Sequence, residues 1–429
     1  MSNIKHGEPD GDINAPLKLP CGVVLQNRIV KAAMTEHMAD SSNHATSRHH
    51  NLYRAWAQSG AGLLLTGNVL VDRRYLEDAG NVAIDGAQDA QALAALKKWA
   101  ALGTENGTQL WMQINHAGRQ SPAHINIETV GPSSISQPAY MGRAFGKTRG
   151  LTAEEIKSTI ARYAYVASMA RETGFTGVQI HGAHGYLVSS FLSPKSNQRE
   201  DEWGGSLENR SRFALEIIRA IRAKVGDDFP LALKLNSSDF QKGGFTHEEC
   251  LEVVGWLNNE KLDLLEISGG SYEARAWQGV ALADPTVKQT TRAREGFFLD
   301  YARGVAKVAA MPLMVTGGFR DPQVMKQALR DGALDFIGLA RPFCAGPDEI
   351  KALLLGSNKV LSAVERRLQS PLDDIWCMTQ MLRMSEDKSF ETEFDPEKAK
   401  DEVVGYIVGV RDRWQKPDGI TASDVRTNL

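Results

Sequence analysis

The stretch HGAHGYLVSSFLSPKSNQREDEWGGSLENRSRF, residues 181–213, decides both the fold and the chemistry that we expect of this chain. A short apolar run, GVQI at residues 177–180, comes directly before it and is typical of a buried strand. His181, His184 and Tyr186 therefore stand together at the end of a strand, among small residues that leave room for a ligand. Because imidazole N–H groups polarise a carbonyl oxygen and a phenol donates a proton, this group indicates acid-assisted reduction rather than packing.

The composition of the chain excludes several classes of protein. The 49 basic and 52 acidic side chains leave a formal net charge of −3, which argues against nucleic acid as the main partner. No apolar run approaches the roughly 18–20 residues of a membrane helix, and the polar N-terminus lacks the apolar core of a signal peptide. The four cysteines are scattered without a CxxC pair, so neither a disulfide framework nor a cysteine-bound metal is expected. We therefore expect a cytoplasmic protein with a small-molecule substrate and no membrane partner.

Eight short apolar runs alternate with amphipathic helical segments along the chain. Most of these runs lack strict alternation of apolar and polar residues, as expected for parallel strands that are buried on both faces. The candidate strands are residues 29–33, 63–69, 109–114, 177–181, 231–236, 264–268, 313–316 and 336–338. Eight strand–helix units predict an α/β fold, the (β/α)8 TIM barrel. A doubly wound sheet is the alternative, weakened because no GxGxxG motif follows the first strand.

Several sequence motifs between these strands predict where a helix begins. Capping boxes at Thr152 and Thr246, each with a glutamate three residues later, predict two helices, and Asp321-Pro322 predicts a third. The alanine-rich segment 90–102 is helical by propensity. We expect the barrel to occupy residues 1–356, with a loop or small hairpins at 115–150 over its mouth. We expect residues 357–429 to form a C-terminal helical extension packed on the barrel.

The loops after the seventh and eighth strands carry the features of a phosphate site. Functional groups of such a barrel lie on the loops that follow the strands. Gly317 and Gly318 let backbone amides approach an anion closely, and Arg341, next to Ala340, could add a two-pronged contact. This pairing predicts that the barrel binds a phosphorylated ligand.

Two polar side chains are expected to face the axis of the barrel. Gln113 lies on the third strand and Lys234 on the fifth, where an unpaired buried charge is costly and a polar ligand is needed. Flavin mononucleotide, FMN, meets this need, because its pyrimidine edge suits Gln113 and its N1 region becomes anionic on reduction beside Lys234. Alternatively, Lys234 pairs with a buried acid such as Glu266.

From residue 27 to residue 347 the chain resembles the old yellow enzyme family of FMN-dependent ene-reductases. The stretch 181–213 carries most of this resemblance, supported by QINHAGR at 113–119, VTGGFRDP at 315–322 and GLARPF at 338–343. The resemblance implies a (β/α)8 barrel with non-covalently bound FMN at its mouth and NADH or NADPH as the reductant. It implies that the flavin passes a hydride to the β-carbon of an activated alkene in a carbonyl or nitro compound.

The resemblance also assigns roles to individual residues. His181 and His184 resemble the pair that grips the substrate oxygen, and Tyr186 resembles the acid that protonates the α-carbon. Thr35 resembles the residue near flavin O4. The residues expected to bind the cofactor are Ala33, Met34, Thr35, Gly67, Gln113, Lys234, Gly317, Gly318, Ala340 and Arg341. No metal site is expected.

The chain departs from the family pattern at four positions. The cation on the fifth strand is usually arginine, whereas here Lys234 keeps the charge and loses the planar fork. Ala33 stands where many members carry proline. His37 and Asn115 stand where branches of the family have a tyrosine and a tryptophan that face the substrate. We therefore expect His37 and Asn115 to line the substrate pocket, whose preference stays open.

Three other functions remain open at the level of sequence. The same fold could oxidise an amine or an N-methyl compound, as some relatives of the family do. A flavin-free barrel could act as a lyase or isomerase on a phosphorylated sugar bound at Gly317, Gly318 and Arg341. A non-catalytic flavin-binding protein is the third alternative. The oligomeric state is also open, and a homo-oligomer is one expectation.

Overall fold

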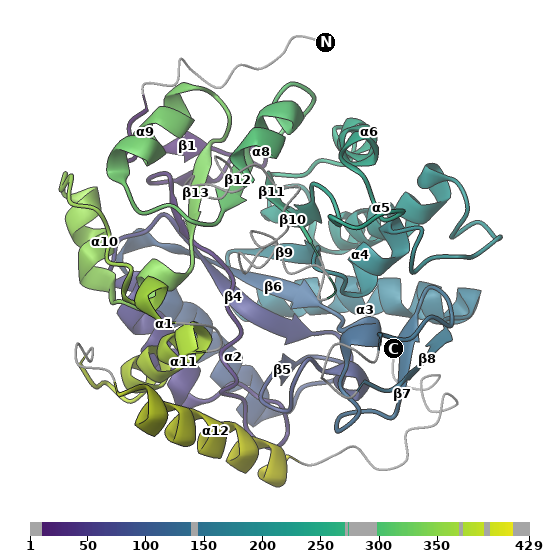
Figure 1. The fold of residues 1–429 in the computed structure, drawn as a ribbon, viewed down its shortest axis with the longest axis horizontal. Coiled ribbons are helices and arrows are strands. Elements are labelled where there is room, and N and C mark those ends of the chain that lie inside the picture. The colour runs from purple at the N-terminus through teal and green to yellow at the C-terminus, as the bar shows by residue number, and fades with distance from the viewer. Residues whose placement is uncertain are drawn as a thin grey trace.

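Eight parallel strands close into a barrel in the computed structural model, and helices surround them (Figure 1). The structure describes residues 11–138, 145–270, 273, 298–368, 372–389 and 395–414, and every candidate site residue falls within these ranges. The predicted excursion at 115–150 and the predicted extension at 357–429 fall partly outside the described residues. The barrel strands are β3 (Ile29–Lys31), β4 (Leu63–Leu70), β6 (Gln109–Asn115), β9 (Gly177–Gly182), β10 (Leu231–Asn236), β11 (Leu264–Ser268), β12 (Leu313–Thr316) and β13 (Phe336–Leu339).

The first strand closes the barrel by pairing with two others. Ile29 of β3 is the partner of Ile337 in β13, and Val30 is the partner of Leu63 in β4. The strand order around the ring is β3, β13, β12, β11, β10, β9, β6 and β4, and all these pairs run parallel. A further short strand, β5 (Val82–Ala83), pairs with the outer end of β4. The predicted (β/α)8 fold is confirmed, and the doubly wound alternative is wrong.

The predicted helix starts are confirmed where the sequence marked them. Thr152 opens α3 and Thr246 opens α6 through complete capping boxes, and Asp321 caps α9 with Pro322 at its first position. The capping side chains satisfy backbone N–H groups that a helix start leaves without partners. The described helices between barrel strands are α1 (Ser47–Ala57), α2 (Ala90–Gly103), α3 (Ala153–Glu172), α4 (Leu187–Leu192), α5 (Leu207–Val225), α6 (His247–Leu257), α8 (Leu299–Val305) and α9 (Pro322–Arg330); α10 (Pro347–Leu354) follows β13.

An apolar plug fills the end of the barrel where the strands begin. Leu17 and Leu25 come from an antiparallel pair, β1 (Leu17–Lys18) and β2 (Val24–Leu25), and lie in one buried cluster with first residues of the barrel strands. The other buried residues of this cluster include Val30, Leu63, Leu65, Trp111, Ala232, Leu264, Met314 and Phe336 from the strands, and Ala32 directly after β3. Because this end is closed by hydrocarbon, polar chemistry is confined to the opposite end, where the strands finish.

The segment after β6 differs from the predicted hairpins. Its two short strands, β7 (Glu128–Gly131) and β8 (Lys147–Gly150), run parallel to one another, with Glu128 opposite Lys147. Parallel strands need a crossover rather than a tight turn, so the sequence carried no turn signal that could have revealed this pair.

Two helices of the C-terminal part lie against the outside of the ring. The first, α11 (Leu372–Ser385), packs on α1, and the second, α12 (Pro396–Arg413), packs on α11 (Figure 1). Met378, Met381 and Met384 of α11 are buried in the main core cluster, as expected of packing residues. In the described part of the chain, no helix is both long and apolar enough to cross a bilayer.

Candidate active site

A chain of polar side chains crosses the barrel above the apolar plug. Gln113 Nε2 donates to Gln179 Oε1 at 2.7 Å, and Gln179 Nε2 donates to Glu266 Oε2 at 2.8 Å. Lys234 Nζ lies 3.0 Å from the other carboxylate oxygen, which also accepts a hydrogen bond from Thr316 Oγ1 at 2.7 Å. Five neighbouring strands thus supply one continuous network. Gln113, Lys234, Glu266 and Thr316 each lie two residues after a member of the apolar plug, in keeping with the period of a strand.

The pairing of Lys234 with Glu266 is the alternative that the sequence had left open. The two residues are register partners on β10 and β11, and both side chains are buried. An ammonium has three N–H donors, so one ion pair leaves Lys234 able to donate to a further acceptor. The ion pair and a role toward a cofactor are therefore compatible.

His181, His184 and Tyr186 form one cluster of rings at the end of β9. The His181 ring lies 5.1 Å from the His184 ring and 4.8 Å from the Tyr186 ring, both edge to face. His184 has a left-handed backbone with φ of 63°, held by a hydrogen bond of 3.1 Å from its N–H to Asn236 Oδ1. A strained non-glycine residue held in place by its surroundings is typical of a functional site.

Both imidazoles of this cluster are neutral at neutral pH. Burial, assisted by the positive charge of Lys234, lowers the pKa of His181 and of His184 well below the ordinary value. The Ala183 N–H donates to His181 Nδ1 at 3.3 Å, so the ring hydrogen of His181 is on Nε2. His184 Nε2 lies 2.7 Å from Ser268 Oγ. A neutral imidazole with a fixed N–H can donate a hydrogen bond to an oxygen that gains negative charge.

The Tyr186 hydroxyl donates to a residue that the sequence did not single out. Its partner is Glu77 Oε1 at 2.8 Å, while Glu77 Oε2 accepts from Thr35 Oγ1 and Asn68 Nδ2, each at 2.9 Å. The Thr35 hydroxyl has one hydrogen, so while it donates to Glu77 it can only accept elsewhere. A hydrogen bond from Thr35 to flavin O4, near which Thr35 is expected to lie, would therefore require this hydrogen to turn.

Of the two residues expected to face the substrate, Asn115 is buried and His37 is half-buried. Asn115 is fully buried on the face of β6 that also carries Trp111 and Gln113, and neither end of its amide has a hydrogen-bond partner among the described residues. His37 has a left-handed backbone with φ of 57°, and its Nδ1 is also without a partner within the described ranges. Buried polar groups normally have partners, so such atoms point to a ligand or water.

The predicted phosphate residues lie side by side at the ends of β12 and β13. Gly317 and Gly318 both have left-handed backbones, with φ of 132° and 80°. A Cβ built on Gly317 would meet nothing within 4 Å, so open space lies beside this backbone. Arg341 follows Ala340 and has a loose ion pair of 3.7 Å with Asp373 of α11.

The remaining predicted cofactor residues follow β3 or lie on β4. Ala33 borders the apolar plug, and Met34 Sδ lies 3.8 Å from Cys344 Sγ. Gly67 is buried, and a Cβ there would come within 2.4 Å of the Met34 carbonyl oxygen. These three residues thus border the inner rim of the barrel without offering side-chain charge.

The observed groups fit a flavin mononucleotide. The unpaired amide of Asn115 and the space beside Gly317 are features that a bound ligand would fill. Gln113 and Lys234 would serve the pyrimidine edge, and Arg341 with the Gly317–Gly318 backbone would serve the phosphate. No group of three or more His, Cys, Asp or Glu side chains in the described ranges is arranged to hold a metal ion.

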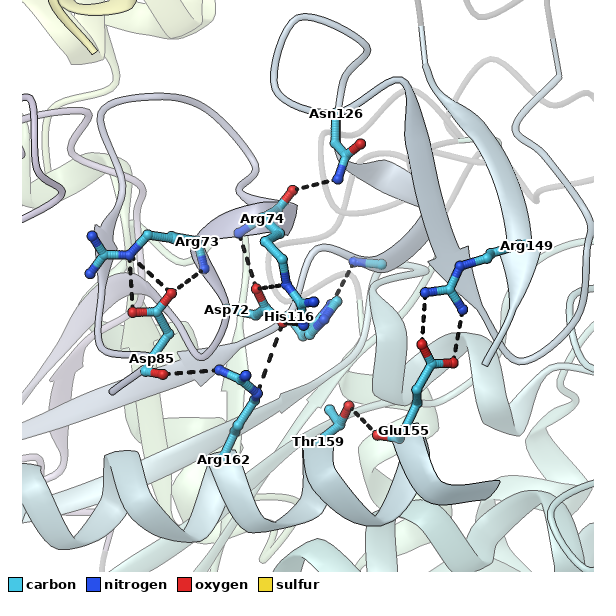
Figure 2. A network of polar contacts seen from close by, with 11 residues as sticks. Asp72, Arg73, Arg74, Asp85, His116, Asn126, Arg149, Glu155, Thr159 and Arg162 are labelled. Carbon is cyan, nitrogen blue, oxygen red and sulfur yellow. Dashed lines mark hydrogen bonds and ion pairs between the residues drawn. The ribbon is translucent and has the colours of Figure 1, made fainter. Parts of the chain in front are cut away.

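A second polar network braces the loops next to the site (Figure 2). Asp72 accepts two hydrogen bonds from the Arg74 guanidinium, at 2.9 and 2.5 Å, and Arg162 of α3 lies 4.0 Å away. Burial alone would raise the pKa of Asp72, but Arg74 and Arg162 outweigh it and lower the pKa to about 2. His116 stacks on Tyr75 within this network, as expected of a residue that braces the loop after β6.

Sequence reasoning missed four residues of the site. Gln179 lies two residues before His181 on the same strand face, so the period of the strand could have revealed it. Asn236 and Ser268 are the last residues of β10 and β11, where functional groups are expected. Glu77 lies in a loop 109 positions from Tyr186, and no local signal marks it.

A closed parallel barrel with hydrogen-bond donors gathered at the ends of its strands defines a (β/α)8-barrel enzyme. The model of the NADH:flavin oxidoreductase / NADH oxidase family matches residues 12–356. The chain belongs to this family. It is therefore an oxidoreductase that uses FMN with a nicotinamide, and the flavin-free lyase alternative is wrong.

Individual relatives agree with this family. The NADH-dependent flavin oxidoreductase iliE of Hypocrea jecorina (strain QM6a) is 35% identical over 384 residues, covering 85% of this chain and 94% of that protein. A protein of the same name from Neonectria sp. (strain DH2) is 35% identical over 382 residues; the match covers 84% of this chain and 48% of that protein.

Solved structures agree in fold. A complex of 2-naphthoyl-CoA reductase has a TM-score of 0.76 and 28% identity, covering 91% of this chain and 58% of that one. An old yellow enzyme homologue from Zymomonas mobilis has a TM-score of 0.68 and 22% identity, covering 84% of this chain and 98% of that one. The resemblance to the old yellow enzyme family is confirmed by the family model and the iliE relative, and these structures agree with it in fold.

Proposed function

We propose that this enzyme reduces the activated C=C bond of α,β-unsaturated carbonyl or nitro compounds, with NADH or NADPH as the reductant. The cluster of two neutral imidazoles and a phenol at the end of β9 is the observation that carries the proposal. FMN, when bound, supplies the hydride for the β-carbon. His181 and His184 hold the substrate oxygen, and Tyr186 gives a proton to the α-carbon.

The electrostatics of the site favour this reaction over the oxidation of an amine. Burial, with a smaller contribution from Lys234, keeps both imidazoles neutral. Neutral imidazoles can donate to a substrate oxygen that becomes negative, and they offer no counter-charge to a cationic amine. We therefore keep amine or N-methyl oxidation as the competing outcome of the test.

Stopped-flow spectroscopy of the FMN-loaded enzyme under nitrogen tests the proposal. NADH and NADPH are mixed with the enzyme in turn, and the bleached enzyme is then mixed with cyclohexenone. We expect the flavin absorbance to return with the alkene. An enzyme that neither nicotinamide bleaches, or that methylated amines bleach and cyclohexenone does not reoxidise, would contradict the proposal.

Replacement of both histidines tests their part in binding. Phenols are good probes because their oxygen would accept from both imidazoles. We expect the His181→Ala/His184→Ala enzyme to bind p-hydroxybenzaldehyde about a hundredfold more weakly, since two hydrogen bonds to a charged oxygen are lost. His44→Ala is the matched control, because His44 pairs with Asp40 in a loop elsewhere. Equal phenol affinity in the double variant would refute the assignment.

Replacement of the phenol separates the two half-reactions. We expect Tyr186→Phe to slow reoxidation by the alkene at least about tenfold, since general acid catalysis contributes roughly 100- to 10,000-fold. Reduction by the nicotinamide needs no proton from this phenol and should change less than about twofold. An equal loss in both half-reactions would contradict the role of Tyr186.

A further inference from the structure

The carboxylate of Glu77 joins three parts of the site that are far apart in sequence. It accepts from Thr35 after β3, from Asn68 in β4 and from the Tyr186 hydroxyl after β9, all at 2.8–2.9 Å. Glu77 lies in the loop between β4 and β5 and is half-buried. Oε2 accepts the bonds from Thr35 and Asn68, so a proton on Oε1 would leave both in place and would turn the bond with Tyr186 round, with Glu77 as the donor.

The loop of Glu77 is already held by its neighbour. Asp78 accepts from the Ala79 N–H at 2.8 Å and pairs with Arg411 of α12 at 2.5 Å. Asn81 Oδ1 accepts from the Asp78 N–H at 2.7 Å. Since these contacts fix the backbone, the direction of Glu77 toward Tyr186 is not needed to shape the loop.

Proton transfer from Tyr186 demands a second proton at this place. Once the phenol has given its proton to a substrate, a phenolate would stand 2.8 Å from Glu77 Oε1. Two negative charges at this distance repel one another strongly in a partly buried site. A carboxyl group that carries a proton removes the repulsion, because it can donate to the phenolate oxygen.

We propose that Glu77 is the proton relay of this site, returning a proton to the Tyr186 oxygen after Tyr186 has protonated the substrate. The inference rests on the proposed function. In the first step the enolate electron pair forms the C–H bond at the α-carbon and the Tyr186 O–H bond breaks. In the second step the Glu77 O–H bond breaks and the Tyr186 O–H bond forms again. Water then protonates the Glu77 carboxylate, so solvent supplies the proton and no residue changes its oxidation state.

The variant Glu77→Gln tests the relay, because glutamine keeps the size and an acceptor oxygen but cannot release a proton. We expect reoxidation by cyclohexenone to slow about tenfold or more. We also expect the wild type to lose rate at high pH, where Glu77 is deprotonated, and the variant to lack this loss. Reduction by the nicotinamide should stay within about twofold. Glu105→Gln, at an exposed position, is the matched control and should behave as wild type.

A double variant separates the relay from a structural role. If Glu77 acts through Tyr186, Glu77→Gln should cause no further loss in the Tyr186→Phe enzyme, since contacting residues with one shared role are not additive. If the fold-losses in reoxidation rate of the two single variants multiply in the double variant, the proposal is overturned.

Infrared difference spectroscopy gives a readout that needs neither substrate nor nicotinamide. A protonated carboxylic acid has its own C=O stretching band, so the wild type minus Glu77→Gln difference should contain one band that disappears as pH rises. The same band should move in Tyr186→Phe, which lacks its hydrogen-bond partner. Asp239 is another buried carboxyl group that could contribute a band. It is present in all of these proteins, so its band cancels in the difference spectrum. A difference without such a band overturns the relay, whereas a wild type that reduces no alkene overturns the proposed function.

Discussion

At the scale of single residues, close contacts decide what each position of the site tolerates. Gly67 donates its N–H to Glu36 Oε1 at 2.8 Å, and Glu36 also accepts from the Tyr53 hydroxyl. The loop after β3, which carries Thr35, is thereby pressed against β4. The three rings of the site could be predicted because their residues are neighbours in sequence. Glu77 could not, because only the closed barrel brings it to Tyr186.

We expect Gly67→Ala to destabilise the protein by about 1–3 kcal/mol, the usual cost of an overpacked core. Its Cβ would lie 2.1 Å from Glu36 Oε2 and 2.4 Å from the Met34 carbonyl oxygen. Urea unfolding measures the effect, and FMN affinity should fall with it because the loop must move. Gly86→Ala is the control, since a Cβ there meets nothing within 4 Å. If the two variants had the same urea midpoint, the loop would accommodate the new Cβ without loss of stability and the prediction would fail.

We expect Glu266→Gln to lower the free energy of unfolding by about 3–5 kcal/mol, because it leaves the Lys234 ammonium buried without its counter-ion. The double variant Lys234→Met/Glu266→Gln should recover part of the loss. Urea unfolding of the three proteins checks this. The single variant Lys234→Met gives the reference. If the losses of unfolding free energy in the two single variants simply add up in the double variant, the two residues do not act as a pair.

At the scale of elements, strands were easier to predict than their partners. The bounds predicted for β10, β11 and β12 agree with the structure, because each strand is a short, mostly apolar segment. The β7–β8 pair escaped prediction since its contacts join segments without alternation. No sequence signal predicted where α12 packs either. Tyr406 donates to the His37 carbonyl at 3.0 Å, and Arg411 pairs with Asp78, so this helix holds the loops after β3 and β4.

We expect Arg411→Met to cost about 1–3 kcal/mol of unfolding free energy, because the nearly buried Asp78 carboxylate loses a charged partner. The variant should also raise the KM for substrate, since Glu77 is the neighbour of Asp78. Arg413→Met is the matched control, because it removes the same charge from the same helical turn. Thermal unfolding and steady-state kinetics of both variants check the prediction, which fails if they behave alike.

At the scale of the whole molecule, buried groups set how stability depends on pH. Burial lowers the pKa of His116 to about 4 and that of His49 to about 3. The unfolded chain takes up protons at these residues below about pH 6.5, whereas the folded chain does not until lower pH. Stability is therefore lost as the pH falls from 6.5 toward 4.

We expect each of these histidines to remove about 2 kcal/mol of unfolding free energy between pH 7 and pH 5. His49→Gln should flatten the dependence by that amount, because glutamine can keep the capping box with Thr46 without titrating. Urea unfolding at pH 7, 6 and 5 measures the difference. A slope equal to that of the wild type would contradict the prediction.

The closure of the ring by β3 has a consequence for synthesis on the ribosome. Ile29 of β3 pairs with Ile337 of β13, so this edge of β3 stays unpaired until about 300 more residues have been synthesised. At roughly 5–20 residues per second this delay is about 15–60 seconds. During that interval the nascent chain exposes an unpaired edge, where chaperones that bind apolar segments would have their longest opportunity to act.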